Sequence, residues 1–67
     1  MKIFSERLVK SIKENGITQA ELADKIGMSR QSVSDYCNDK TEPAFEVLIQ
    51  ICKVLGESAD YLLGLED

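Results

Sequence analysis

Five polar residues fall within one eight-residue segment, and all of them can form hydrogen bonds. They are Arg30, Gln31, Ser32, Ser34 and Asp35. Arginine can donate two parallel hydrogen bonds to guanine, glutamine can pair with adenine, and a carboxylate can accept from the amino group of cytosine. The same residue types also suit the solvated face of any surface helix. The segment therefore indicates base reading only if a scaffold presents it to a nucleic acid.

A second set of polar residues flanks this segment and is suited to contact phosphate groups. The set comprises Thr18, Gln19, Ser29, Asn38, Lys40 and Thr41. Gln19 lies where a helix is expected to begin, and the free backbone N–H groups and dipole of a helix N-terminus attract anions. Lys40 can be interpreted equally well as a solvated loop lysine that contacts no phosphate.

The stretch Thr18–Cys37 has the pattern of two short helices, 19–26 and 30–37, joined by a tight turn. Thr18 and Glu21 have the spacing of a capping box, Gly27 is suited to end the first helix, and Ser29 is suited to cap the second. The small residue Ala23 allows a close crossing of the two helices. Apolar residues occupy the inward positions Leu22, Ile26, Met28, Val33 and Tyr36. The pattern is typical of a helix-turn-helix, and an αα-hairpin unrelated to nucleic acids is the alternative.

The remaining sequence predicts three further helices, over residues 4–14, 45–55 and 59–63, which gives one all-α domain of five helices spanning residues 1–67. An apolar stripe at four-residue spacing (Phe4, Leu8, Ile12) is expected to face the core. In the helix 45–55 the expected inward stripe is wider. It comprises Phe45, Leu48, Cys52 and Leu55, with Ile49 and Ile51 beside them. Apolar residues near the end of the chain form either a dimer contact or the last part of the core: Tyr61, Leu63 and Leu65.

The charge distribution is uneven along the chain. The 67 residues carry eight basic and twelve acidic side chains, a net charge of −4. Residues 1–17 carry four basic and two acidic side chains, residues 18–43 three and five, and residues 44–67 one and five. Proteins that bind nucleic acids usually have a basic excess. Because the local field decides phosphate binding, we expect the acidic last third to face away from any nucleic acid.

Several classes of function are disfavoured by what the sequence lacks. It contains no histidine and no glycine-rich phosphate loop, so neither an enzyme nor a bound cofactor is expected. Two cysteines, Cys37 and Cys52, cannot form a four-ligand zinc site within one chain, and we expect both to be free thiols. No apolar run approaches the ~20 residues of a membrane span, and no signal peptide is evident. A cytoplasmic protein without membrane contact is therefore expected.

With these residues placed, the chain resembles the phage repressor and Cro type of helix-turn-helix domain, also called the xenobiotic-response-element (XRE) family. The resemblance covers nearly the whole chain and rests on residues 16–23, 27–34 and 38–40, on Pro43, and on residues 55–63. It implies a compact, lambda-repressor-like bundle of five helices from a bacterium or phage. It also implies a homodimer that binds a double-stranded DNA operator and regulates transcription, most often by repression. By position, Gln19, Asn38 and Lys40 resemble backbone contacts, and Arg30, Gln31, Ser32 and Asp35 resemble base-reading residues.

The chain departs from the family pattern at several positions. Ile12 and Cys37 stand where many members carry a buried arginine–glutamate pair, Asp39 where glycine is common, and Ala44 where serine or threonine caps the next helix. Asp35 and Asp39 place negative charge on the presumed DNA-facing side. These carboxylates and the net charge favour an alternative function on the same fold, a protein-interaction module such as an antitoxin or antirepressor with a protein partner.

Overall fold

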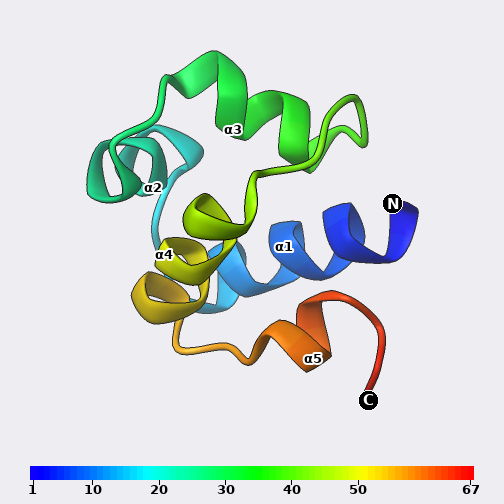
Figure 1. Cartoon of the computed structure of the whole chain (residues 1–67). Helices are drawn as coiled ribbons and strands as arrows, with labels where there is room; N and C mark the ends of the chain where they lie inside the picture. The colour runs from blue at the N-terminus through cyan, green and yellow to red at the C-terminus, as the bar shows by residue number, and fades with distance from the viewer.

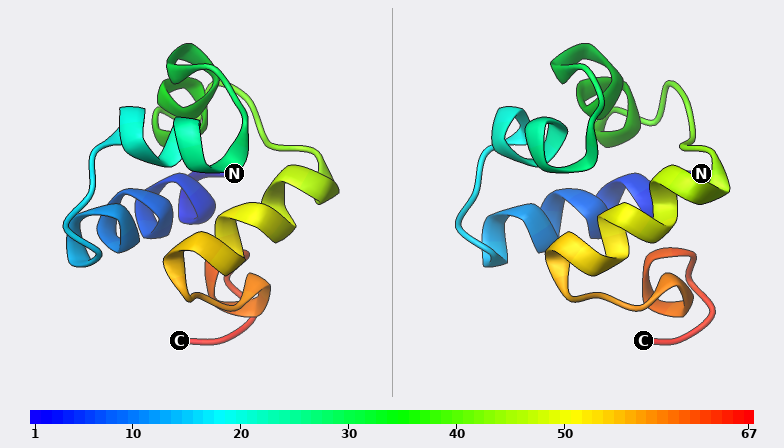
Figure 2. Two further views of the ribbon diagram at one scale, coloured as in Figure 1. Left: turned by 90° about the vertical axis from the view of Figure 1, so that its left-hand side faces the viewer. Right: turned by 60° about the vertical axis from the view of Figure 1, so that its left-hand side comes forward.

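The computed structural model describes all 67 residues and contains five helices without strands. Their bounds are α1 Lys2–Glu14, α2 Gln19–Ile26, α3 Arg30–Cys37, α4 Phe45–Leu55 and α5 Ala59–Leu62. Figure 1 shows α3 at one end of the molecule and α5 at the opposite end, with α1 and α4 between them, and Figure 2 agrees. The molecule measures 28 × 23 × 20 Å along its principal axes. None of the five helices has the length and apolar character that a membrane span requires.

The boundaries of the central helices follow from their capping residues, as the sequence predicts. The Thr18 hydroxyl accepts the Glu21 N–H at 3.0 Å, and the Glu21 carboxylate accepts the Thr18 N–H at 2.9 Å, which completes the capping box. Gly27 ends α2 with a φ of 71°, a left-handed conformation that glycine adopts without the steric cost of a Cβ. The Ser29 hydroxyl then accepts the Ser32 N–H and caps α3.

One hydrophobic core joins all five helices. Its fully buried members include Leu8 of α1, Leu22 of α2, Val33 of α3, Ile51 of α4 and Leu62 of α5. The complete cluster is Phe4, Leu8, Ile12, Leu22, Ala23, Val33, Tyr36, Cys37, Leu48, Ile51, Leu55 and Leu62. Ala23 is buried as expected. Ile12 and Cys37 are buried in the same core, so apolar packing occupies the two positions where the family pattern has a buried ion pair.

Three expectations from the sequence are wrong in detail. Helix α1 begins two residues before Phe4, because the Met1 carbonyl already accepts the Ser5 N–H and nothing in the sequence interrupts this first turn. Helix α5 ends at Leu62, and the next residue is its C-cap. Phe45 and Ile49 do not face the core: they are 85% and 51% exposed. The inward stripe of α4 is instead Leu48, Ile51 and Leu55, and no other element covers the opposite face.

Polar contacts attach α1 to the last third of the chain. The guanidinium of Arg7 lies 4.5 Å from the centre of the Tyr61 ring and donates to the carbonyl oxygens of Tyr61 and Glu66. The buried Ser11 hydroxyl donates to the Glu57 carboxylate at 2.9 Å. Asn15 donates to the Leu55 carbonyl at 3.2 Å. These contacts fix the acidic C-terminal region beside α1.

Candidate nucleic-acid interface

Helix α3 has one buried face and one polar face. Val33, Tyr36 and Cys37 point into the core, and Arg30 and Gln31 are exposed in the first turn. Ser32, Ser34 and Asp35 are half-buried. The polar face thus contains all five residues that the sequence analysis selected for base reading.

The first turns of α2 and α3 enclose an open cleft of about 490 Å³. Its lining consists of Gln19, Ala20, Arg30, Gln31 and Ser34. The N-terminus of α2 and its free backbone N–H groups therefore lie beside the polar face of α3. Small Ala20 leaves the cleft open between the longer side chains.

Hydrogen bonds hold most of the polar side chains of α3 in defined positions. The amide nitrogen Nε2 of Gln31 donates to Oδ1 of Asp35 at 2.9 Å. The hydroxyls of Ser29 and Ser32 lie 2.9 Å apart. Arg30 has no hydrogen bond or ion pair within the chain, so its five N–H donors are available to a ligand.

Three of the expected phosphate contacts, Asn38, Lys40 and Thr41, lie at the opposite end of α3, outside the cleft. Asn38 folds back on α3 and donates from Nδ2 to the carbonyl and the hydroxyl of Ser34, at 2.9 and 3.2 Å. Lys40 and Thr41 are exposed in the loop that follows. The turn at Asp39 uses a φ of 59°, which aspartate tolerates better than most residues. Two separate groups of candidate phosphate contacts therefore flank the polar face of α3.

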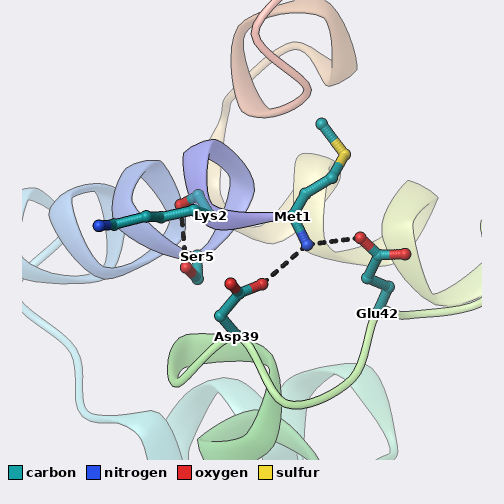
Figure 3. A network of polar contacts seen from close by, with 5 residues as sticks. All are labelled: Met1, Lys2, Ser5, Asp39 and Glu42. Atoms are coloured by element: carbon teal, nitrogen blue, oxygen red, sulfur yellow. Dashed lines mark hydrogen bonds and ion pairs between the residues drawn. The ribbon is translucent and has the colours of Figure 1, made fainter.

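An ionic contact at this loop is not evident from the sequence. The α-amino group of Met1 lies 2.7 Å from Oδ1 of Asp39 and 2.6 Å from Oε2 of Glu42 (Figure 3). These two hydrogen bonds raise the pKa of the amine above its ordinary value of 8.0. The partners are 38 and 41 residues apart in the chain, so no local pattern could indicate the contact. The positive charge of the amine partly offsets two carboxylates beside Lys40.

The two cysteines are free, as expected, and neither belongs to the polar face of α3. Cys37 is buried on the inner side of α3, and burial raises the pKa of its thiol. Cys52 of α4 is half-buried, and desolvation raises the pKa of its thiol as well. Both side chains are therefore neutral packing residues near pH 7.

Comparisons with known proteins agree with this geometry. Residues 9–62 match the model of the helix-turn-helix family. The chain is 41% identical over 61 residues to the uncharacterized HTH-type transcriptional regulator YqaE of Bacillus subtilis, a match that covers 91% of this chain and 53% of that protein. It is also 41% identical over 64 residues to the cryptic phage CTXphi transcriptional repressor RstR of Vibrio cholerae, covering 96% of this chain and 56% of that protein. The chain thus spans about half the length of these curated relatives.

A solved structure has the same arrangement of helices. The solution structure of the DNA-binding domain of the P22 C2 repressor superimposes with a TM-score of 0.84 at 37% sequence identity, covering 90% of this chain and 79% of that domain. Together, the family model, the curated relatives and the shared fold lead to one conclusion: the chain belongs to the helix-turn-helix family of the phage-repressor type.

Proposed function

We propose that the chain binds double-stranded DNA in a sequence-specific manner and regulates transcription, with α3 in the major groove. The observation that carries this proposal is the cleft between α2 and α3, where Arg30, Gln31 and Ser34 share one open surface with Gln19. A recognition helix enters the major groove with its N-terminal residues, and Arg30 and Gln31 occupy the first turn of α3.

Each part of the interface has a proposed role. Arg30 and Gln31 read base edges, and Ser32, Ser34 and Asp35 complete the reading face. Gln19 and Thr18 contact phosphate at the N-terminus of α2, together with Ser29 in the turn. On the other side of α3, the phosphate contacts are Asn38, Lys40 and Thr41. Two flanking sets of backbone contacts would fix the register of α3, because phosphate contacts position a protein and base contacts specify the sequence.

The placement of charge makes DNA binding compatible with the net charge of −4. Four of the carboxylates (Glu57, Asp60, Glu66 and Asp67) belong to α5 and its flanking residues, at the end of the molecule opposite α3 (Figure 1). Charges separated by more than the Debye length of about 8–10 Å are largely screened in water at physiological salt. The molecule extends at least 20 Å along each of its principal axes. These carboxylates therefore repel DNA phosphates only weakly.

Repression by a homodimer in the bacterial cytoplasm is the regulatory mode that we favour. Two of the similar proteins are named repressors. A single domain of 67 residues offers few base contacts, and a second copy on a two-fold site doubles them. The proposal gives the chain no catalytic role.

The test is a fluorescence-anisotropy titration of a labelled random-sequence duplex at ~50 and ~200 mM salt. Two or more phosphate contacts predict that affinity falls about tenfold or more over this range. Selection from a random library then supplies a preferred duplex, which should bind at least ~1000-fold more tightly than random sequence. Absence of binding to every duplex at low salt would contradict the proposal.

A protein-interaction module on the same fold is the second candidate function. It is favoured by exposed apolar side chains away from α3, among them Phe45 and Leu65, which is 76% exposed. This candidate predicts that the chain does not bind heparin or DNA at low salt. The anisotropy titration therefore separates the two functions directly.

A further inference from the structure

An exposed apolar stripe runs along the free face of α4. Phe45 and Ile49 are four residues apart and are 85% and 51% exposed, and the half-buried Cys52 continues the stripe. Beside Phe45 opens an apolar groove of about 180 Å³, lined mainly by Met1, Phe4, Pro43, Leu48 and Leu63. Nothing within the chain covers the stripe or the groove. They form one continuous apolar surface, because Phe45 belongs to both.

Two opposite charges border the stripe on the same edge. Glu46 lies in the first turn of α4 and Lys53 in the last turn, and both side chains are exposed. They are seven residues apart, which is two helical turns, so they project in nearly the same direction. Neither forms an ion pair within the chain.

We infer that a second copy of this chain packs on the stripe, with the two α4 helices antiparallel across a two-fold axis near Ile49. In that arrangement Glu46 of each copy faces Lys53 of the other, and Ile49 faces its own equivalent. In a parallel arrangement the two-fold axis would run along the helices, so the edges that carry Glu46 and Lys53 would lie on opposite sides of the interface and neither charge would meet a partner. The charges therefore select the antiparallel pairing, and a two-fold interface requires such self-complementarity. This inference rests on the proposed function for its biological use, a dimer on a two-fold DNA site.

The position of α4 leaves the DNA-reading face free. Helix α3 lies at one end of the molecule, and α4 crosses the middle (Figure 2). With 11 residues, α4 is about 16 Å long, so the buried patch is small and the dimer is weak in free solution. Two copies on adjacent half-sites have a high effective concentration, and the same contact then stabilises the complex.

Disulfide trapping tests the geometry. In a Cys52→Ser background, Ile49→Cys places a thiol at the two-fold axis, where the two copies meet. Glu6→Cys, at an exposed position of α1, is the matched control. Under mild oxidation we expect the Ile49→Cys chain to form a covalent dimer at least tenfold faster than the control. Equal cross-linking rates for the two variants would overturn the proposed interface. The same result would be obtained if the protein dimerised through another face.

Charge exchange tests the direction of the pairing. By sedimentation equilibrium, Glu46→Lys and Lys53→Glu should each weaken dimerisation about three- to tenfold, because each places like charges across the two-fold axis. The double variant Glu46→Lys/Lys53→Glu should recover most of this loss. Circular dichroism on the same samples reports whether the monomer remains folded. Additive weakening in a folded double variant would contradict antiparallel pairing.

Failure of this inference is distinguishable from failure of the proposed function. A duplex with a single half-site binds one copy and does not need the α4 contact. Binding of the wild-type chain to that duplex, together with equal cross-linking rates, would refute the α4 interface alone. Absence of binding to any duplex would refute the proposed function, and the cross-linking rates would still decide whether α4 pairs with its copy.

Discussion

Asp35 holds the amide of Gln31 in one orientation on the surface of α3. The two residues are four positions apart on the helix, and Nε2 of Gln31 lies 2.9 Å from Oδ1 of Asp35. Because an ionised carboxylate only accepts hydrogen bonds, the amide nitrogen must face Asp35. The oxygen and the second N–H of Gln31 remain free. These are the acceptor and the donor that adenine requires at N6 and N7.

We therefore expect Asp35→Ala to reduce the preference for adenine at the base pair that Gln31 contacts. A bidentate contact contributes about 1–3 kcal/mol of discrimination, and a freely rotating amide loses part of it. Asp35→Asn is the matched variant: it removes the charge but retains an oxygen that accepts from Gln31. It should strengthen binding to all duplexes and retain the preference. Anisotropy titrations of the selected duplex and its single-base variants measure both effects, and equal preference in wild type and Asp35→Ala would exclude this role.

Arg30→Ala should weaken binding to the selected duplex by about 1–3 kcal/mol and change binding to random DNA much less. The reason is that Arg30 is exposed at the start of α3 and has no partner within the chain, so its donors are free for a base edge. Lys10→Ala, which removes an exposed positive charge from α1, is the control. Equal losses on selected and random duplexes would show that Arg30 contacts phosphate instead of a base.

Lys40→Ala should weaken binding to all sequences by a similar factor. A phosphate contact carries no sequence information, and its removal should reduce the slope of log K against log salt by about 0.9. Lys40 is exposed in the loop after α3, beside two carboxylates. Lys13→Ala, at an exposed position in the last turn of α1, supplies the comparison. An unchanged slope in Lys40→Ala would identify Lys40 as a solvated loop residue.

Features encoded by neighbouring residues could be predicted from the sequence. The capping box of Thr18 and Glu21, the left-handed Gly27 and the cap at Ser29 each depend on residues within a few positions. These three features fix both bounds of α2 and the start of α3. With the short turn between the helices, they bring Gln19 and Arg30 into one cleft. The roles of these residues toward DNA remain predictions.

Features that depend on distant packing could not be predicted. Spacing alone suggests that Phe45 lies on the inner stripe of α4, but α2 and α5 pack against α4 and bury Leu48 and Ile51, and Phe45 is left exposed. The contact of Met1 with the loop after α3 joins residues about 40 positions apart. Such a pairing depends on the path of α1 past the loop, which no sequence pattern within either segment encodes.

The Met1 contact predicts a pH dependence of stability in the alkaline range. The folded state raises the pKa of the α-amino group above 8.0 through its hydrogen bonds with Asp39 and Glu42. The resulting stabilisation is complete at pH values below the pKa that the α-amino group has in the unfolded chain. It is lost as the pH rises through the higher pKa that the same group has in the folded state. From about pH 7 to 10, the Tm of wild type should therefore fall more than that of Asp39→Asn/Glu42→Gln. Asparagine tolerates the φ of 59° at position 39. Parallel Tm curves for the two proteins would rule out this coupling.

Ala44→Ser should stabilise the chain by about 0.5–1 kcal/mol. Helix α4 begins without a side-chain cap, although Ala44 already has the extended backbone of an N-cap residue, with φ −63° and ψ 158°. A serine hydroxyl at this position can accept the free N–H of Val47 without a backbone change, as Ser29 and Ser58 do for α3 and α5. Urea unfolding should show a higher midpoint at an unchanged m-value. Ala44→Val is the control, because valine provides no hydrogen-bond acceptor and should not stabilise the chain. Equal urea midpoints for Ala44→Ser and Ala44→Val would show that any stabilisation does not come from capping.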